Sequence, residues 1–350
     1  MIKLKIIDYV INDNGELVPI VADVEITEIK KPDTENHNNV KEVIINGVRG
    51  FLKESSESMP TFDKFDYLLA KLGKLLGLSM ADEYLVKDGD KTYLFSKSVV
   101  KENEKLIMFS QINKEIIKRW NIPNEMIDRI LNNEDINELF IEYNISDDIK
   151  MNFIQLLKEI NELKEFRNNQ ELYDPTPGKE KYKVNDDNIE YIINIFINRI
   201  KVFHLPNEDE IIKDYIKMCF FDALIGNKDR NVNNYGIIKK EDGTYSFAPL
   251  FDSSTLAIRM HNNEEISSEL WQLNEYLMDR KKTLQYIIKT YPNYIKDMLD
   301  NDIEKIREII SLISKEVLDE EELEWFNSVI IDKLNNKTFD YIKESDSILS

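Results

Sequence analysis

Alternation of apolar and polar residues predicts strands in the first hundred positions of the chain. Residues 1–8 and 18–30 alternate with the period of two that is typical of a half-buried strand. Two shorter strands, 42–45 and 48–53, flank Asn46-Gly47, a dipeptide that strongly favours a two-residue hairpin turn. The N-terminal part is therefore predicted to be a small β-rich unit.

A helix is predicted directly after the second strand of this hairpin. Thr61 or Asp63 can cap its start, and Gly77 stands where it ends. Its apolar face repeats at helical spacing in Phe65, Leu68, Leu69, Leu72, Leu75 and Leu76. The segment from Tyr93 to Val99 is again predicted to begin as a strand.

From Ile107 onward, the apolar positions repeat mostly at helical spacing. The predicted helices are 113–120, 124–132, 136–143, 147–166, 187–203, 269–278, 280–291, 292–299, 303–313 and 320–333. The order of the elements predicts an α+β fold with a β-rich N-lobe, residues 1–98, and a larger, mainly helical C-lobe, residues 99–350.

One further helix is predicted to lead into a polar loop and a hairpin. Asn207 begins a capping-box pattern, apolar residues follow at helical spacing, and Gly226 stands where a C-cap belongs. After the loop, 235–240 and 245–251 have the pattern of two short strands. This hairpin would carry the chain away from the loop and bring it back close to it.

The polar loop and the end of the hairpin hold the residues with the clearest chemical meaning. Asp229 is followed five residues later by Asn234, and Asp252 follows the second strand. In phosphoryl-transfer sites, an Asp in such a loop accepts the proton of the attacking hydroxyl, while an Asn and a second Asp hold Mg²⁺. The spacing therefore favours a phosphotransferase site.

The run from Leu224 to Asn234, followed by Ala248-Pro249-Leu250-Phe251-Asp252, resembles the HipA-like serine/threonine kinases. Their pattern is roughly G-N-x-D-x-H-x-x-N, a hairpin, and P-x-Y-D, with Asn231 here in place of His. The resemblance implies a bilobal protein-kinase-like fold that uses ATP and Mg²⁺. It makes Asp229 the catalytic base, Asn234 and Asp252 the metal ligands, and Asn231 part of the nucleotide site.

The same resemblance implies nucleotide contacts in the N-lobe. Lys53 would contact the phosphates and pair with Asp66, where the family usually has Glu. Backbone groups of Phe95-Ser96-Lys97 would pair with the adenine edge. By its order in the chain, the phosphate-covering loop falls at 31–39, where asparagines stand in place of glycines. Because Lys53 comes so early, we expect the compact form that lacks the family's extra N-terminal subdomain.

Composition narrows the possible partners and location. The net charge of −20 argues against a broad surface for nucleic acid or for an anionic membrane. No apolar run approaches the roughly 18 residues of a membrane span, and the first residues lack a signal-peptide core. Cys219, the single cysteine, is consistent with a reducing compartment. We expect a cytoplasmic protein, or a secreted effector without a recognisable signal.

The main hypothesis is a protein serine/threonine kinase, and two alternatives stay open. The resemblance implies a kinase that modifies a cellular protein, such as an aminoacyl-tRNA synthetase or a host protein, and that can also phosphorylate itself. It also implies a small antitoxin as a candidate partner. Asp229-Arg230 also resembles the D-R-x-x-x-N of phosphatidylinositol kinases, which favours a lipid substrate. The absence of a glycine-rich loop favours instead a nucleotide-binding pseudokinase.

Overall fold

The structure is a computed structural model, and some predicted features lie outside the part that it describes. It describes residues 3–30, 40–55, 61–89, 91–132, 134–170, 186–227, 230, 232–253 and 280–334. The predicted phosphate-covering loop at 31–39, the predicted helix at 269–278, and the residues Asp229 and Asn231 are not among them.

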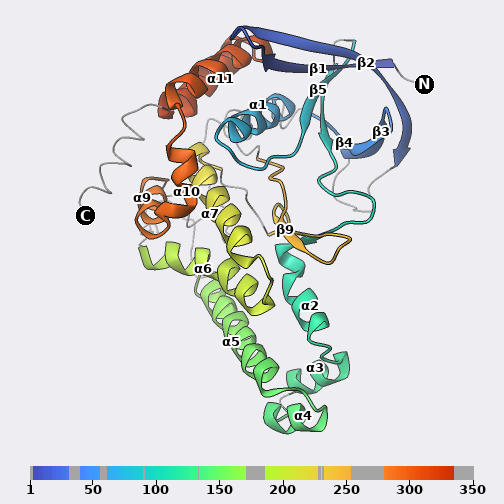
Figure 1. Ribbon diagram of the computed structural model, residues 1–350, viewed down its shortest axis with the longest axis vertical. Helices are drawn as coiled ribbons and strands as arrows, with labels where there is room; N and C mark the ends of the chain where they lie inside the picture. The colour runs from blue at the N-terminus through green and yellow to red at the C-terminus, as the bar shows by residue number, and fades with distance from the viewer. Residues whose placement is uncertain are drawn as a thin grey trace.

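An antiparallel barrel forms the N-terminal part of the molecule (Figure 1). Its strands are β1 (Lys3–Ile11), β2 (Leu17–Lys30), β3 (Val40–Ile45), β4 (Val48–Glu54), β5 (Glu83–Asp88) and β6 (Lys91–Lys97). They close in the order β1-β2-β3-β4-β6-β5. The predicted hairpin turn is present, with φ of 48° at Asn46 and 79° at Gly47, and it places Val40 opposite Lys53.

The alternation of side chains along these strands separates two environments. Leu52, Val86 and Phe95 lie in one hydrophobic cluster with other barrel residues. Their neighbours Leu85 and Leu94 belong to the larger core that contains helix α1 (Phe62–Leu75). Because successive strand residues point to opposite faces, Lys53 is on the same face as Leu94, its cross-strand partner.

Helices make up most of the C-terminal part. Its elements are β7 (Lys105–Met108), α2 (Phe109–Arg119), α3 (Asn124–Leu131), α4 (Ile136–Glu142), α5 (Asp147–Gln170), α6 (Asp186–Phe203), α7 (Glu208–Ile225), β8 (Gly236–Lys239), β9 (Tyr245–Phe247), α9 (Arg280–Thr290), α10 (Pro292–Leu299), α11 (Ile303–Val317), α12 (Glu320–Val329) and the short η2 (Ile331–Lys333). Helix α7 is buried at Ile211 and Ile212 and from Tyr215 to its last residue, as is typical of a central core helix. Strands β7, β8 and β9 form a small second sheet.

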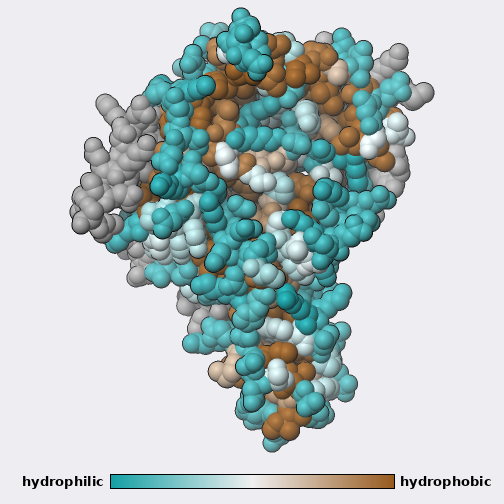
Figure 2. All heavy atoms as spheres, viewed as in Figure 1, coloured by the Kyte–Doolittle hydropathy of each residue, from teal (hydrophilic) through white to brown (hydrophobic). Residues whose placement is uncertain are grey.

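Helices α2 to α5 form an arm that extends away from the barrel (Figure 1). The arm has its own small core, which includes Met126, Phe140 and Phe153. Hydrophobic residues also gather on the surface at its far end (Figure 2). Ile141 of α4 is among the exposed apolar side chains. Among the described residues, no helix combines the length and the apolar character needed to cross a membrane.

Two local expectations differ from the structure. The side chain of Asn207 does not cap α7, because its Nδ2 donates instead to the backbone oxygen of Tyr245 at 2.5 Å. The second strand of the hairpin ends at Phe247 rather than at residue 251. Beyond it, Leu250 forms a parallel bridge with Met80, in the connection between α1 and β5. This non-local pairing brings the chain after the hairpin to the N-lobe.

Candidate active site

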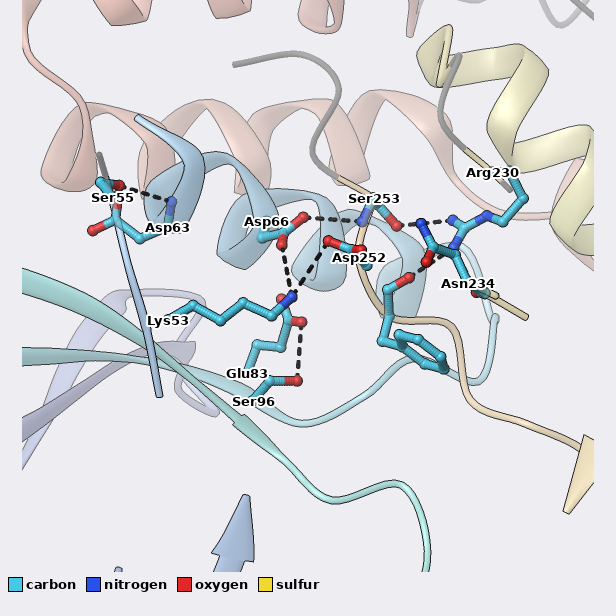
Figure 3. Close-up of polar contacts among 11 residues, drawn as sticks. Lys53, Ser55, Asp63, Asp66, Glu83, Ser96, Arg230, Asn234, Asp252 and Ser253 are labelled. Carbon is cyan, nitrogen blue, oxygen red and sulfur yellow. Dashed lines mark hydrogen bonds and ion pairs between the residues drawn. The ribbon is translucent and has the colours of Figure 1, made fainter. Parts of the chain in front are cut away.

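Lys53 lies between two carboxylates that come from distant parts of the chain (Figure 3). Its Nζ is 3.4 Å from Oδ1 of Asp252 and 3.6 Å from Oδ2 of Asp66. Only 14% of the Lys53 side chain is exposed, which excludes the interpretation of a solvent-facing strand lysine. The expected pair of Lys53 with Asp66 on the next helix is present.

Asp66 connects this lysine to the segment after the hairpin. Its side chain is almost fully buried on α1, and its Oδ1 accepts a hydrogen bond of 3.0 Å from the backbone N–H of Ser253. The other oxygen faces Lys53. One carboxylate therefore fixes both the N-lobe lysine and the residue that follows Asp252.

A third carboxyl group near the lysine, that of Glu83, was not predicted from the sequence. Glu83 begins β5, is buried, and accepts a hydrogen bond from Ser96 Oγ at 3.3 Å (Figure 3). Burial, with a smaller contribution from Asp66, raises the pKa of Glu83 to about 8. Glu83 therefore keeps its proton at neutral pH.

The charges around Lys53 also shift the other two groups. Burial raises the pKa of Asp66 to about 6, although Lys53 opposes this shift. Burial lowers the pKa of Lys53, but Asp252, Asp66 and Glu83 together outweigh it and raise that pKa above its ordinary value. The lysine is therefore a permanent cation at neutral pH.

Asp252 has a backbone conformation that few side chains adopt. Its φ is +55°, in the left-handed region, where Asp and Asn are the best tolerated residues after Gly. Such a conformation persists only when its surroundings hold it, and it concentrates at functional sites. Here the residues on both sides of Asp252 are held by one buried arginine.

That arginine is Arg230, in the middle of the predicted catalytic loop (Figure 3). Its Nε and Nη2 donate to the two oxygens of Asp222 at 3.0 Å each. Nη1 donates to the backbone oxygens of Asn234 at 3.1 Å and Phe251 at 2.7 Å, and Nη2 also donates to Ser253 Oγ at 3.0 Å. These bonds use all five N–H groups of a guanidinium. Arg230 therefore ties the loop at Asn234 to the segment around Asp252.

The position of Arg230 depends on the end of α7. Asp222 is buried in the last turns of this helix, and its Oδ1 also accepts from Asn227 Nδ2 at 2.9 Å. Gly226 has φ of 70°, which ends the helix as predicted and turns the chain back toward Asp222. The sequence held one signal for this pair: an acidic residue within an apolar helix needs a partner when it is buried.

The predicted catalytic loop is also held from the side of α2. The first amides of this helix, those of Phe109 and Ser110, donate to the backbone oxygens of Tyr235 and Val232 at 3.0 and 3.1 Å. Ser110 Oγ donates to Asn233 Oδ1 at 2.6 Å. Asn234 is itself buried. Val232, Asn233 and Tyr235 are thus held against α2. Asp229 and Asn231 lie outside the described residues.

The strand pairing differs from the expectation for adenine contacts at Phe95-Ser96-Lys97. Strand β6 is a middle strand: Phe95 and Ser96 have cross-strand partners in both β4 and β5. The backbone N–H of Lys97 donates to Asp82 at 2.8 Å. The ladder therefore occupies backbone groups that the expectation assigned to the base.

The donor set fits a magnesium–nucleotide complex. Asn234 and Asp252 offer amide and carboxylate oxygens, which are the ligands that the hard Mg²⁺ ion prefers. A protonated lysine beside them suits phosphate oxygens.

No protein-family model matches the chain, and no curated protein matches it in sequence. Among solved structures, the proinflammatory kinase CtkA of Helicobacter pylori is similar over 93% of this chain and 98% of its own, with a TM-score of 0.50 and 16% identity. The chain has the fold of this kinase. The expected α+β, bilobal, kinase-like fold is thereby confirmed.

A second similar structure is the toxin–antitoxin complex of HipA, HipB and operator DNA from Shewanella oneidensis MR-1. It matches 91% of this chain and 67% of its own chain, with a TM-score of 0.44 and 13% identity. At such low identity, the comparison with CtkA extends to the fold alone.

Proposed function

We propose that this chain is an ATP- and magnesium-dependent protein serine/threonine kinase, which transfers the γ-phosphate of ATP to a hydroxyl group of a protein. The observation that carries the proposal is the position of Lys53 between Asp66 and Asp252. A strand lysine, an acidic residue on the following helix and an aspartate after the catalytic hairpin are the parts that protein kinases assemble around the nucleotide phosphates.

Each residue of the site then has a role. Asp229 accepts the proton of the attacking hydroxyl, and Lys53 contacts the phosphates while Asp66 holds its ammonium in place. Asn234 and Asp252 would hold Mg²⁺, which supplies charge neutralisation for the phosphates. Arg230 keeps the two ligand-bearing segments together through its bonds to Asn234 and Phe251.

Phosphate transfer from labelled ATP tests the proposal. The purified protein is incubated with labelled ATP and Mg²⁺ in the presence of a generic protein acceptor. A second incubation without the acceptor detects phosphorylation of the protein itself. Because Asp229 acts in the transition state, Asp229→Asn should lower transfer by on the order of 100-fold or more while ATP affinity changes little. ATP binding without transfer by the parent would instead favour the pseudokinase alternative, and equal transfer by Asp229→Asn would remove Asp229 from its role.

The lipid-kinase alternative loses its main support. It rested on Asp229-Arg230, but Arg230 is buried and its N–H groups bind Asp222, Asn234, Phe251 and Ser253. An arginine held in this way recognises its own chain rather than a lipid headgroup. Phosphoinositide vesicles added to the same assay provide the direct comparison, and transfer to lipid but not to protein would reverse the order of the two proposals.

The substrate and partner belong to the same proposal. The resemblance suggests a cellular protein substrate, either an aminoacyl-tRNA synthetase or a host protein, and a small antitoxin as partner. Comparison of phosphorylated proteins in cells that express the parent or Asp229→Asn tests the first. Co-purification of a small protein with the chain from its native cells tests the second.

A further inference from the structure

Helix α1, which carries Asp66, packs against α12, near the C-terminal end of the described chain. The ring of Phe65, on α1, stacks on Trp325 and Phe326 of α12, with centroid distances of 5.5 and 5.7 Å. Phe65 and Phe326 are fully buried. Aromatic pairs in this geometry add about 0.5–1.5 kcal/mol to the burial of their surface.

An ion pair next to these rings strengthens the same contact. Lys64 Nζ lies 2.9 and 2.7 Å from the two carboxylate oxygens of Glu322, whose side chain is only 7% exposed. Glu322 also accepts from the backbone N–H of Asp319 at 2.9 Å, in the capping box that begins α12. The carboxylate is therefore fixed by its own helix before it binds Lys64, which reduces the entropy that the pair must lose.

These contacts lie directly beside the active-site carboxylate. Lys64 and Phe65 immediately precede Asp66, and an α-helix transmits a displacement of one residue to the next. The distance of 3.6 Å between Asp66 Oδ2 and Lys53 Nζ leaves little room for a shift of α1 before the pair separates. In protein kinases the equivalent lysine–acid pair must be in place for transfer, and the position of its helix controls it.

We propose that Glu322, Trp325 and Phe326 form an intramolecular clamp that positions α1, and through it Asp66 and Lys53, for phosphate contact. The three clamp residues are positioning residues, because none of them reaches the site. The consequence for phosphate transfer rests on the proposed function, whereas the consequence for the order of α1 does not. The chain would thus position α1 through its own C-terminal residues, without a separate partner protein or a covalent modification.

Three variants, called the clamp variants below, each remove one contact between α1 and the clamp, and a fourth variant is a matched control. Trp325→Ala removes an aromatic partner. Lys64→Met and Glu322→Gln remove the ion pair and are milder, and Gln at this position can still complete the capping box. Glu321→Gln makes the same chemical change one residue away, at an exposed position of α12. Hydrogen exchange of the amides in 62–75 and the ratio of ATP affinity to adenosine affinity are measured in the full chain.

We expect faster exchange in α1 for the three clamp variants and parent-like exchange for Glu321→Gln. The preference for ATP over adenosine should fall by about 10-fold and transfer by up to about 100-fold, because the phosphate contact loses its support. In an Asp66→Asn background the clamp variants should lower transfer no further, since they act through Asp66. A general loss of stability would instead lower transfer by the same factor in both backgrounds.

The outcomes separate this proposal from the proposed function. If the parent binds ATP but transfers no phosphate, the kinase proposal fails, and the exchange and affinity measurements still decide on the clamp. If the parent binds no nucleotide, the exchange measurement decides alone. Two results would overturn the clamp. One is unchanged hydrogen exchange in α1 for Lys64→Met and Glu322→Gln. The other is an equal loss of phosphate transfer from these variants in the parent and in the Asp66→Asn background.

Discussion

Glu83 is the residue whose charge state is furthest from its ordinary behaviour. It shares one cation, Lys53, with Asp66 and Asp252, and its pKa of about 8 lies above the ordinary value of 4.5. The folded protein therefore holds a proton on Glu83 between about pH 4.5 and 8 that the unfolded chain releases. For such a raised carboxyl pKa, the contribution to the free energy of unfolding is largest at low pH and is lost as pH rises through this window.

Glu83→Gln should remove this pH dependence. Gln stays neutral and can still accept the hydrogen bond from Ser96, so that the variant gains relative stability toward pH 8. The gain there should be at least about 1 kcal/mol, since each pKa unit corresponds to about 1.4 kcal/mol. Urea unfolding of the apo protein at several pH values between 5 and 8.5 measures it, with the exposed Glu321→Gln as control. Parallel curves for parent and Glu83→Gln would contradict the assignment of a buried proton.

Arg230 is the residue on which most of the polar site depends. Arg230→Met leaves Asp222 as a buried carboxylate without its cation, which should lower the free energy of unfolding by about 3–5 kcal/mol. Arg230→Lys should recover part of this loss, because an ammonium offers three donors and no planar fork for Asp222. Chemical denaturation measures both. Parent-like stability and ATP binding in Arg230→Lys would mean that the five-bond geometry is not required.

At the scale of single elements, features that depend on neighbouring residues were predicted correctly from the sequence. Contacts between residues far apart in the chain were not. The turn at Asn46-Gly47 and the αL end of α7 at Gly226 follow from dihedral preferences of the residues themselves. The capping box of α12 begins at Asp319, directly before the predicted helix 320–333. Asn207 has the same kind of pattern, but its side chain donates to Tyr245, 38 residues away. A pattern within four residues cannot reveal that competitor.

The same reason explains what was missed in the site. Asp66 and Asp252, which pair with Lys53, were predicted because the family resemblance includes these positions. Glu83 and Asp222 became visible only when strand pairing and the loop after α7 placed their partners beside them. The short strand β7 was not predicted, because it depends on pairing with the distant strand β8 rather than on a long pattern of its own. Strand β5, which forms a hairpin with β6, was not predicted either.

The pairing of β7 with β8 leads to a prediction on Gly236, which begins β8. A Cβ at Gly236 would lie 2.9 Å from Met108 Cα and even closer to the backbone oxygen of Ile107, so that backbone must move. Gly236→Ala should destabilise the protein by at least about 1–3 kcal/mol. Gly73→Ala is the matched contrast, because the three atoms nearest to its added Cβ all belong to the flexible side chain of Met80, and a helix favours Ala. Equal melting temperatures for both variants would contradict this reading of the sheet.

At the scale of the whole molecule, the two lobes meet where the nucleotide is proposed to bind. The backbone N–H of Leu250 donates to Ser79 and that of Ala81 to Leu250, both at 2.8 Å, so that the segment before Asp252 is joined to the N-lobe. Lys53 and Asp66 then reach across to Asp252 and Ser253. A ligand that contacts Lys53 and Asp252 together therefore bridges both lobes, and its binding should be visible as stabilisation of the whole fold.

Asp252→Asn should abolish the magnesium-dependent part of this stabilisation. A ligand at 100 times its dissociation constant adds about 2.7 kcal/mol to the free energy of unfolding, which raises the melting temperature by several degrees. Asn tolerates the φ of +55° at this position, whereas Ala would add backbone strain and lower the stability of the apo protein as well. Melting is followed with ATP in Mg²⁺ and in EDTA, with Asp13→Asn, the same change at an exposed position between β1 and β2, as control. We expect an apo melting temperature close to that of the parent in both variants, and a magnesium-dependent rise only in the parent and Asp13→Asn. A rise of parent size in Asp252→Asn would mean that the metal is held elsewhere.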